Sequence, residues 1–371
     1  MVKELKESTK FVLSVEFWRI GLYWTVALLV SYFQLLLFPK HFKSYPRCSP
    51  TSTSSKSISS TVCIITGATS GLGKAAAFAL SKEGFFVVLA GRSTTKLAET
   101  VAEIKNVNKD AQVKAFQVDV SSLQSLLKFK DSLQQWLLDS NMHSSIQLLI
   151  NNAGILATLS RCSEEGFDQA MGTNYIGAFS LTKLLLPLLG NSPVASRIVN
   201  VTSFTYRSVS SVQVDNDTVS GKCFMRLKGY PCGHVYEYSK LCLLLFSYEL
   251  HRRLGAMANF HHVSVIAVDP GAVETNIMRE LPLCISYLAL SVLRLVGLLQ
   301  SPERGVSAIL DASLAPPEVS GLYFFGGKGR AINSSKLSYN PKLGEQLWTT
   351  SSALLKAACL ETCFSAADTI L

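Results

Sequence analysis

The feature that most constrains the fold of this chain is a regular alternation of short apolar segments with longer helix-like segments, beginning near residue 61. The apolar segments cover residues 61–66, 85–90, 112–118, 146–150, 197–201, 263–268 and 320–325. Helix-like segments separate them, from about residue 72 and then around residues 96–105, 123–138, 167–189 and 235–254. Near-continuous apolar strands separated by helices are typical of a parallel sheet that is covered on both faces. The sequence therefore predicts an α/β fold with a doubly wound parallel sheet of about seven strands.

A glycine-rich turn, TGATSGLG at residues 66–73, follows the first predicted strand and precedes the first predicted helix. Glycine lets the chain turn tightly there. It also lets backbone N–H groups approach a pyrophosphate at a helix N-terminus, where the helix dipole favours negative charge. A turn of this kind in this position predicts a dinucleotide site. The residues expected to bind the cofactor are Gly67, Ser70, Gly71, Leu72 and Gly73.

Four further motifs follow in order along the chain. They are Asp119-Val120, Asn151-Asn152-Ala153-Gly154, Tyr236-x-x-x-Lys240 and Pro270-Gly271-x-Val273-x-Thr275. Together with the Gly-x-x-x-Gly-x-Gly turn, they resemble the short-chain dehydrogenase/reductase family over roughly residues 61–330. The resemblance implies a Rossmann-type fold and an oxidoreductase that uses a nicotinamide cofactor. It also implies cofactor contacts from Asp119, Val120, Asn152, Ala153, Gly154, Tyr236, Lys240, Pro270, Gly271, Val273 and Thr275.

The end of the second predicted strand bears on the choice of cofactor. An acidic residue there binds the ribose 2′-hydroxyl of NAD(H), whereas an arginine accommodates the 2′-phosphate of NADP(H). The sequence AGRS at residues 90–93 has no acidic residue and one arginine, Arg92. The alternative to a phosphate-binding role is that Arg92 is a solvated charge on a loop. We expect NADP(H) to be preferred over NAD(H).

Tyr236 and Lys240 are spaced to share one face of a helix. A free phenol has a pKa of about 10. A neighbouring ammonium lowers that value, so the pair predicts a tyrosine that exchanges a proton with a carbonyl or alcohol oxygen. The resemblance implies that Ser203, rather than the adjacent Thr202, binds the substrate oxygen and that Asn174 holds a water near the lysine. The predicted catalytic set is thus Asn174, Ser203, Tyr236 and Lys240, and no cysteine or histidine spacing predicts a metal site.

The N-terminal part of the chain carries a run of 19 uncharged residues at 20–38, IGLYWTVALLVSYFQLLLF. As a helix this run would span about 28 Å, which matches the hydrocarbon core of a bilayer. A cleaved signal peptide and a buried core helix are the alternatives, but the run is long for a signal peptide and no small-residue cleavage site follows it. We expect residues 1–48 to form a retained anchor with one transmembrane helix and residues 49–60 to be a Ser/Thr-rich linker. Residues 61–332 would then form the catalytic domain, and residues 333–371 a C-terminal tail with one helix.

The net charge of +9 is concentrated at the N-terminal end. Residues 1–60 hold eight basic and three acidic residues, so the rest of the chain carries only +4. This distribution argues against a nucleic-acid partner, and the basic residues that follow the apolar run favour a body that faces the cytosol. Nine cysteines without disulfide-scaffold spacing fit a reducing compartment. We expect a single-pass protein of the endoplasmic reticulum membrane with its catalytic domain in the cytosol.

Two segments bear on the substrate. Residues 206–233 form a longer segment before Tyr236 than the simplest family members have. This segment resembles the corresponding one in the retinol-dehydrogenase-like branch of the family, and we expect it to form a lid over the active site. Residues 281–299, LPLCISYLALSVLRLVGLL, carry one charge and form either a core helix or a lipid-binding surface at the substrate mouth. Together with the anchor, they predict membrane contact and a lipophilic substrate of the retinoid, polyprenoid, sterol or fatty aldehyde class. The sequence leaves open a homo-oligomer, a light-dependent pigment reductase, and a cofactor-binding membrane scaffold or redox sensor with little turnover.

Overall fold

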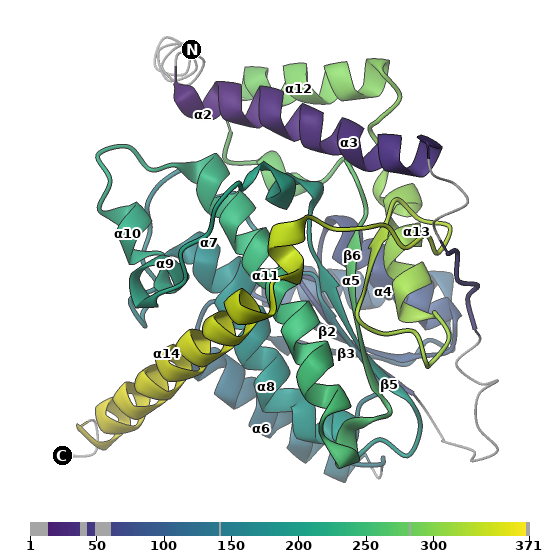
Figure 1. The fold of residues 1–371 in the computed structure, drawn as a ribbon. Helices are drawn as coiled ribbons and strands as arrows, with labels where there is room; N and C mark the ends of the chain where they lie inside the picture. Colours follow the sequence, from purple (N-terminus) through teal and green to yellow (C-terminus); the bar gives the residue numbers. More distant parts are fainter. Residues whose placement is uncertain (1–13, 38–42, 49–60, 141, 282, 369–371) are drawn as a thin grey trace.

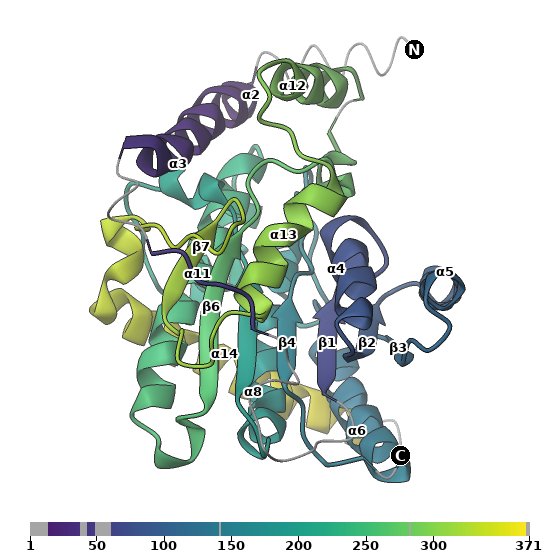
Figure 2. The same ribbon diagram turned by 90° about the vertical axis from the view of Figure 1, so that its right-hand side faces the viewer.

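The sheet at the centre of the molecule has seven strands in the order β3-β2-β1-β4-β5-β6-β7, and every neighbouring pair is parallel (Figures 1 and 2). The computed structural model describes residues 14–37, 43–48, 61–140, 142–281 and 283–368. The predicted linker at 49–60 and, within the predicted anchor segment, residues 1–13 and 38–42 lie outside the described residues.

The strands fall within two residues of the apolar segments expected from the sequence, so the predicted seven-stranded parallel α/β sheet is confirmed. They are β1 (Val62–Thr66), β2 (Phe86–Gly91), β3 (Val113–Gln117), β4 (Leu148–Asn151), β5 (Ser196–Val201), β6 (Val263–Asp269) and β7 (Leu322–Phe325). The order of the strands reverses between β1 and β4. In folds of this kind the ligand binds outside the carboxyl ends of the strands at that reversal.

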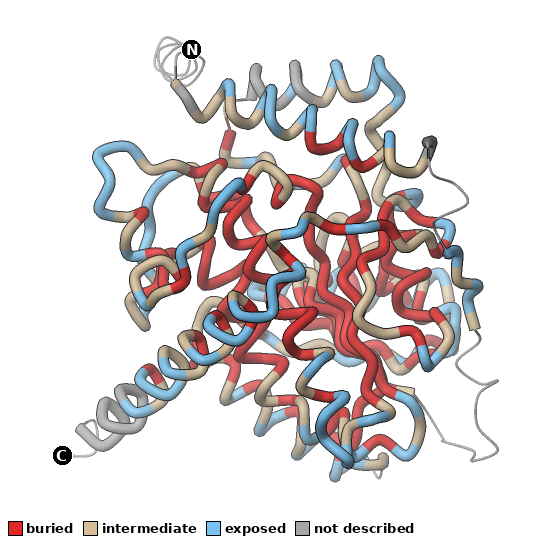
Figure 3. The backbone as a smooth tube through the Cα atoms, viewed as in Figure 1, coloured by how far each residue is buried: buried red, intermediate tan, exposed pale blue. Residues whose placement is uncertain are grey.

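Helices cover both faces of the sheet because parallel neighbours are joined by crossover connections. One face carries α6 (Leu123–Asp139), α8 (Gly177–Gly190) and α11 (Cys232–Gly255). The other face carries α4 (Gly71–Lys82), α5 (Thr94–Val107) and α13 (Pro302–Ser313). The helices and the strands bury two apolar cores between them, which form the red interior of Figure 3.

Short elements fill the connections near the carboxyl ends of the strands. Helix α7 (Gln169–Met171) and the π-helical turn η3 (Gly172–Ile176) lead into α8. The segment expected to form a lid contains most of the 3-10 helix η4 (Phe204–Ser208), together with α9 (Asn216–Ser220) and α10 (Lys222–Met225). Further 3-10 helices among the described residues are η5 (Ala258–Phe260), η6 (Asn276–Met278) and η7 (Lys336–Tyr339).

The N-terminal segment forms a helix that lies against the catalytic body. It consists of α2 (Val15–Trp18), the π-helical turn η1 (Arg19–Tyr23) and α3 (Trp24–Leu37), and is called the N-terminal helix below. It lies beside α12 (Leu283–Leu295) in both views (Figures 1 and 2). Ala27, Leu28 and Ser31 are buried against the body, whereas apolar side chains on the outer face are exposed. Within the described ranges, no helix is both long and apolar enough to cross a membrane.

The C-terminal segment contains α14 (Pro341–Asp368), which packs along α11. The indole of Trp348 stacks on Phe246 of α11 with ring centroids 6.1 Å apart. The guanidinium of Arg253 lies 4.5 Å from the centroid of the Trp348 ring. These contacts hold α14 against the catalytic domain.

Candidate active site

The turn between β1 and α4 requires glycine at several positions. Gly67 and Gly71 have φ angles of +66° and +51°, a region that favours glycine. A Cβ atom on Gly73 would lie 2.3 Å from the carbonyl oxygen of Gly67 and 2.5 Å from Nδ2 of Asn152. Ser70 is the N-cap residue of α4. The first N–H groups of α4 have no acceptor inside their own helix, so they are suited to bind a phosphate.

Thr66 joins this turn to the Asn-Asn-Ala-Gly motif. Its Oγ1 accepts hydrogen bonds from the backbone N–H groups of Asn152 and Ala153, each at 3.0 Å. In return, Nδ2 of Asn152 donates to the carbonyl oxygen of Thr66 at 2.9 Å. The two motifs are therefore one loop cluster at the carboxyl ends of β1 and β4.

Arg92 stands immediately after β2, and its side chain is exposed. It forms no ion pair with any of the residues that the structure describes. Lys74, on the first turn of α4, is engaged with Glu103, since Nζ lies 2.6 Å from a carboxylate oxygen. Of these two basic residues, Arg92 is thus the one whose charge is free to meet a ligand phosphate.

Asp119 and Val120 follow β3 and are held in place by local contacts. Oδ1 of Asp119 accepts hydrogen bonds from the backbone N–H and the hydroxyl of Ser121, at 2.9 Å and 2.6 Å. Val120 packs closely on the start of α8, because a Cβ atom on Gly177 would lie 2.1 Å from the Val120 carbonyl oxygen. Both residues lie at the carboxyl edge of the sheet. The family resemblance predicts that the adenine end of the cofactor binds there.

Tyr236 and Lys240 lie one turn apart on the same side of α11. Both are buried, with 8% and 4% of their surfaces exposed. Nζ of Lys240 lies 5.7 Å from the centroid of the Tyr236 ring. It also donates a 3.0 Å hydrogen bond to the carbonyl oxygen of Val201, the last residue of β5. The structure brings the two residues together at the carboxyl end of the sheet.

Ser203, rather than Thr202, presents its hydroxyl to Tyr236. The hydroxyl of Ser203 is close enough to the phenol of Tyr236 to lower the pKa of that phenol. Oγ of Ser203 also accepts a 3.2 Å hydrogen bond from Oγ1 of Thr205. The hydroxyl of Thr202 instead donates to the carbonyl oxygen of Lys240 at 3.1 Å, so it holds the helix backbone.

Asn174 lies in the π-helical turn η3, and such wide turns are frequent at functional sites. Its side chain accepts a 2.8 Å hydrogen bond from the N–H of Ile155 and donates to the Ile155 carbonyl oxygen at 2.9 Å. It also donates to the hydroxyl of Ser239 at 3.0 Å. A Cβ atom on Gly154 would lie 3.4 Å from both Oδ1 of Asn174 and Nζ of Lys240. The glycine therefore lets these two side chains approach the same point.

The electrostatics of the tyrosine differ from the expectation drawn from the sequence. Burial is the largest influence on the pKa of Tyr236 and raises it, the hydroxyl of Ser203 lowers it, and the charge of Asp269 raises it. Burial also lowers the pKa of Lys240 to about 8, against an opposing effect of Asp269. The sequence predicts a phenol pKa below its usual value, and this is wrong for this structure. Desolvation of the phenol is the largest influence on that pKa, and the ammonium is directed at Val201.

Asp269 is a residue of this site that the sequence reasoning missed. It ends β6 and is fully buried, and burial raises its pKa to about 6. Its carboxylate accepts hydrogen bonds from the N–H of Gly271 at 2.8 Å and from the hydroxyl of Tyr323 at 2.7 Å. The next loop is held by Gln300, which donates a 3.0 Å hydrogen bond to the carbonyl oxygen of Pro270. An acidic residue at the end of an otherwise apolar strand is the sequence signal that could have revealed Asp269.

The segment after Gly271 lies over the glycine turn. A Cβ atom on Gly71 would lie 3.1 Å from Cγ2 of Thr275. A Cβ atom on Gly305 would lie 2.5 Å from Val273 and 3.3 Å from Leu72, so these two side chains meet over α13. The Pro-Gly motif and the glycine turn, which are far apart in the sequence, thus face the same space.

The ring of Tyr236 is enclosed by apolar side chains. Leu156 and Leu281 are buried against it. Three partly buried residues complete the cluster, namely Trp24, Ile277 and Met278. Trp24 comes from the N-terminal helix, and its ring centroid lies 5.5 Å from that of Tyr236. The sequence did not predict this contact, because it treats residues 20–38 as separate from the catalytic domain.

Comparisons with known proteins identify the family to which the chain belongs. A family model described as short chain dehydrogenase matches residues 61–213. The human polyprenol dehydrogenase is 32% identical over 297 residues, covering 78% of this chain and 83% of that protein. The mouse retinol dehydrogenase 12 is 32% identical over 306 residues, covering 82% of this chain and 89% of that protein. An uncharacterised protein from Mycobacterium paratuberculosis, solved by crystallography, has a TM-score of 0.61 at 25% identity, covering 85% of this chain and 98% of its own.

The chain belongs to the short-chain dehydrogenase/reductase family, and its relatives place it in the retinol-dehydrogenase-like branch. Members of this family bind NAD(P)(H). The protein is accordingly an oxidoreductase that acts on alcohol or carbonyl groups.

Proposed function

We propose that this protein is an NADP(H)-dependent oxidoreductase that interconverts an alcohol and a carbonyl on a lipophilic substrate. The observation that carries the proposal is the position of Tyr236. Its phenol lies one helical turn from Lys240, is influenced by the hydroxyl of Ser203 and is enclosed by apolar side chains. A few polar groups among apolar side chains suit a substrate with one oxygen function on a hydrocarbon body.

Tyr236 is the proposed general acid and base. Burial raises the pKa of its phenol, so the hydroxyl keeps its proton at neutral pH, which is the form needed to protonate a carbonyl oxygen. Ser203 donates a hydrogen bond to the same oxygen. Lys240, held by Val201, stabilises the phenolate that remains after the proton has moved. In the opposite direction the phenolate accepts the proton of the alcohol.

Asn174 is the proposed partner of Lys240 in a proton relay. Its Oδ1 and the Lys240 ammonium both lie 3.4 Å from the point that a Cβ atom on Gly154 would occupy. A water molecule beside these two groups would connect the buried ammonium to the polar backbone around Ile155.

The residues around the glycine turn fit a nicotinamide dinucleotide. Gly73 stands where a side chain would collide with the turn, which keeps the backbone accessible to a pyrophosphate. Arg92, exposed and unpaired among the described residues, supports a preference for the 2′-phosphate of NADP(H) over NAD(H). When bound, the nicotinamide supplies the hydride for carbonyl reduction and accepts it in alcohol oxidation.

The proposed substrate class is a long apolar alcohol or aldehyde of the retinoid or polyprenoid type. The apolar cluster around Tyr236 supports it, as does the similarity to a polyprenol dehydrogenase and a retinol dehydrogenase. A light-dependent pigment reductase and a cofactor-binding sensor with little turnover are the remaining alternatives. An activity screen distinguishes them, because only the proposed enzyme reduces lipophilic aldehydes with NADPH in the dark.

We further propose that the N-terminal helix and α12 attach the enzyme to the cytosolic face of the endoplasmic reticulum membrane. The outer face of the N-terminal helix exposes Leu22, Val26 and Phe33, and α12 exposes Tyr287 and Val292. Apolar side chains on two neighbouring helices suit insertion into the interfacial region of a bilayer. The single span expected from the sequence would require the N-terminal helix to leave its contacts with the body, so attachment in the plane of the membrane is the arrangement we propose.

The decisive experiment for the activity compares the wild-type protein with Tyr236→Phe in detergent micelles. Wild-type protein is expected to oxidise or reduce a retinoid or polyprenoid substrate with NADP(H), and Tyr236→Phe to lose turnover while still binding the cofactor. Undiminished turnover in Tyr236→Phe would reject the assignment of the tyrosine.

Membrane attachment is tested on microsomes with the double substitution Leu22→Ser and Phe33→Ser. It should release the protein into the soluble fraction, whereas Leu138→Ser, at an equally exposed leucine of α6, should not. An N-terminal tag that is accessible to protease in intact microsomes agrees with attachment in the plane, and a protected tag would show a span instead.

A further inference from the structure

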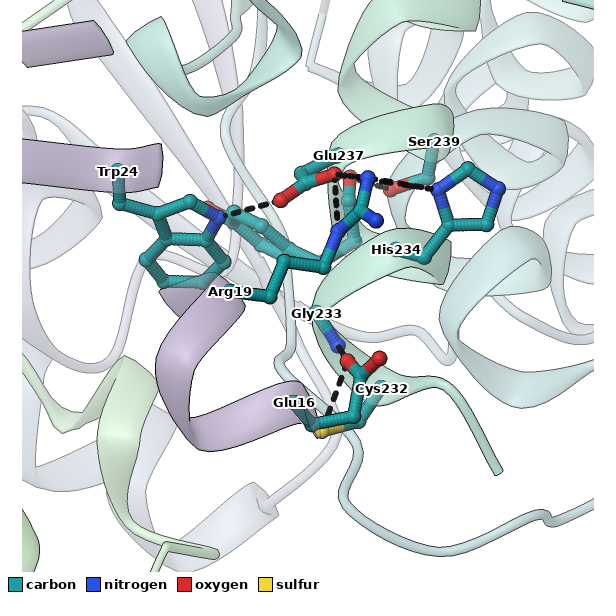
Figure 4. Close-up of polar contacts among 9 residues, drawn as sticks. Glu16, Arg19, Trp24, Cys232, Gly233, His234, Glu237 and Ser239 are labelled. Carbon is teal, nitrogen blue, oxygen red and sulfur yellow. Dashed lines mark hydrogen bonds and ion pairs between the residues drawn. The ribbon is translucent and has the colours of Figure 1, made fainter. Parts of the chain in front are cut away.

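The N-terminal helix contacts the catalytic helix α11 through polar groups, which include Gly233 and Glu237 of α11 (Figure 4). The carboxylate of Glu237, the residue after Tyr236, is completely buried. Arg19 donates to Oε2 of Glu237 from Nε at 2.9 Å and from Nη2 at 2.5 Å. The indole Nε1 of Trp24 donates to the other carboxylate oxygen at 2.7 Å. Glu237 thus binds two side chains of the N-terminal helix at once.

A second contact holds the start of the same two helices together. Oε2 of Glu16 accepts a 2.7 Å hydrogen bond from the backbone N–H of Gly233, in the first turn of α11. An acidic side chain at this end of a helix satisfies a free N–H group and is favoured by the helix dipole. Further along the N-terminal helix, Tyr32 packs on Phe325 of β7 with ring centroids 5.1 Å apart. The N-terminal helix is therefore fixed at both ends and at its centre.

The carboxylate of Glu237 determines the position of the Trp24 ring. A buried charge is stable only when it is paired and hydrogen-bonded, and Arg19 and Trp24 supply these interactions. With its N–H directed at Glu237, the indole lies with its ring centroid 5.5 Å from that of Tyr236. A substrate oxygen that reaches the phenol must come within about 3 Å of it. An indole this close to the phenol ring is placed to contact the hydrocarbon next to that oxygen.

We propose that Trp24 is a specificity-determining residue that forms part of the substrate-binding wall, and that Glu237 and Arg19 are the positioning residues that hold it there. The proposal rests on the proposed function, in which Tyr236 exchanges a proton with the substrate oxygen. It assigns Arg19 and Trp24 of the N-terminal helix to the active site, although the motifs of the catalytic domain begin only at residue 66. The substrate body that suits an indole wall is a flat or extended apolar chain adjoining the reacting carbon.

The kinetic test uses the full-length chain in detergent micelles with all-trans-retinal and with a short aliphatic aldehyde. For Trp24→Ala the KM for retinal should rise about tenfold or more, as expected when a large apolar side chain is removed from the wall of a binding pocket. The kcat for retinal and the KM for the short aldehyde should change less than about threefold. Thr25→Ala, on the exposed side of the same helix, is the matched control and should leave both substrates unaffected.

The positioning role of Glu237 is tested by a conservative and a disruptive variant. Glu237→Gln keeps an oxygen for the Trp24 N–H and should retain most of the wild-type preference for retinal. Glu237→Leu removes both acceptors and should reproduce the rise in KM of Trp24→Ala. Equal kinetic effects of the two variants, or a loss of kcat with KM unchanged, would overturn the positioning role.

A binding measurement separates this inference from the proposed function. Retinoid binding quenches tryptophan fluorescence by energy transfer, so Trp24→Phe should lose much more of the quenching than Trp136→Phe, a substitution in α6. If retinoid quenching depends on Trp24 but no lipophilic substrate is turned over, the proposed function fails and the inference stands. If Tyr236-dependent turnover is present and Trp24→Ala and Trp24→Phe both behave as wild type, the inference fails and the proposed function stands. Thermal melts of all variants establish that they fold, and Trp24→Phe carries the test should Trp24→Ala not fold.

Discussion

The ammonium of Lys240 on α11 donates a 3.0 Å hydrogen bond to the carbonyl oxygen of Val201 at the end of β5. This bond connects the catalytic helix to the central sheet beside the phenol of Tyr236. Because the lysine is buried, its charged form lacks hydration and depends on this carbonyl and on the nearby carboxylate of Asp269. Its protonation state is therefore sensitive to pH in a range that ordinary assays cover.

The first prediction concerns the pH dependence of carbonyl reduction. Burial lowers the pKa of Lys240 to about 8, so the ammonium is lost above that pH. We expect kcat/KM for carbonyl reduction to fall above about pH 8, because the phenolate of Tyr236 then loses the charge that stabilises it. Steady-state rates between pH 6 and pH 10 measure this decrease in kcat/KM. A flat profile up to pH 10 would contradict the role of the lysine.

The same shift predicts a change of stability with pH. The pKa of Lys240 is 10.5 in the unfolded chain and about 8 in the folded one, so the unfolded state binds more protons between these values. The contribution of this lysine to the free energy of unfolding should therefore rise with pH from 8 to 10.5. Lys240→Met should flatten that rise in denaturant titrations at several pH values. An identical pH dependence of the unfolding free energy in the wild type and Lys240→Met would show that the pKa of Lys240 is not lowered by burial.

The third prediction concerns Asp269, whose pKa is raised from 3.8 to about 6 by burial. Its carboxylate raises the pKa values of Tyr236 and Lys240, so Asp269→Asn should lower both. The fall of reduction activity at high pH should then begin at lower pH than in the wild type. Asp131→Asn, at an exposed aspartate of α6, is the control and should leave the pH profile unchanged.

Titration of Asp269 should also make the stability of the protein depend on pH. Because its pKa is raised in the folded state, its proton stabilises the protein below pH 3.8, and this stabilisation is lost as the pH rises through 6. Asp269→Asn should remove this trend from thermal melts recorded between pH 4 and pH 7. A melting temperature of Asp269→Asn that tracks the wild type over that window would show that the carboxyl group does not titrate there.

The fourth prediction concerns the glycine turn. A methyl group at position 73 would collide with the Gly67 carbonyl oxygen at 2.3 Å and with Asn152 at 2.5 Å. Gly73→Ala should therefore destabilise the fold by about 1–3 kcal/mol and weaken NADPH binding, because the turn must shift. Gly255→Ala, at the end of α11 with open space around it, should have little effect on either measurement. Calorimetric titration with NADPH and thermal melts give the two readouts.

The fifth prediction concerns cofactor choice. Arg92→Ala should lower the ratio of NADPH to NADH efficiency by about tenfold, the size expected from losing one charge-assisted hydrogen bond to a phosphate. Lys74→Ala should change the ratio little, because the Lys74 ammonium is already paired with Glu103 at 2.6 Å. An unchanged ratio in Arg92→Ala would remove the support for NADP(H) preference.

Most of the fold could be predicted from the sequence, because the apolar pattern of each strand matches its buried position in the folded protein. A strand covered on both faces must be apolar at nearly every position, and all five residues of β1 and all seven of β6 are buried. The motif residues follow the strands directly, and the carboxyl ends of parallel strands meet at one edge. Their convergence on one site therefore follows from their positions in the chain once the sheet is known.

The protonation behaviour of the site could not be read in the same way. The spacing of Tyr236 and Lys240 places both on one face of a helix, but a pKa depends on how far each group is desolvated and on charges from other elements. The carboxylate of Asp269 and the carbonyl of Val201 come from two different strands. These contributions exist only in the folded chain.

The architecture, the glycine turn and the order of the site motifs follow from the amino-acid pattern, because each depends on residues that are close together in the chain. The place of the N-terminal helix does not follow from it, since hydropathy treats residues 20–38 as one apolar run that can meet either lipid or protein. Folding joins residues more than two hundred positions apart, through the ion pair of Arg19 with Glu237 and the contact of Trp24 with Tyr236. Burial of the Glu237 charge makes that arrangement specific, because an unpaired carboxylate in an apolar interior is strongly unfavourable.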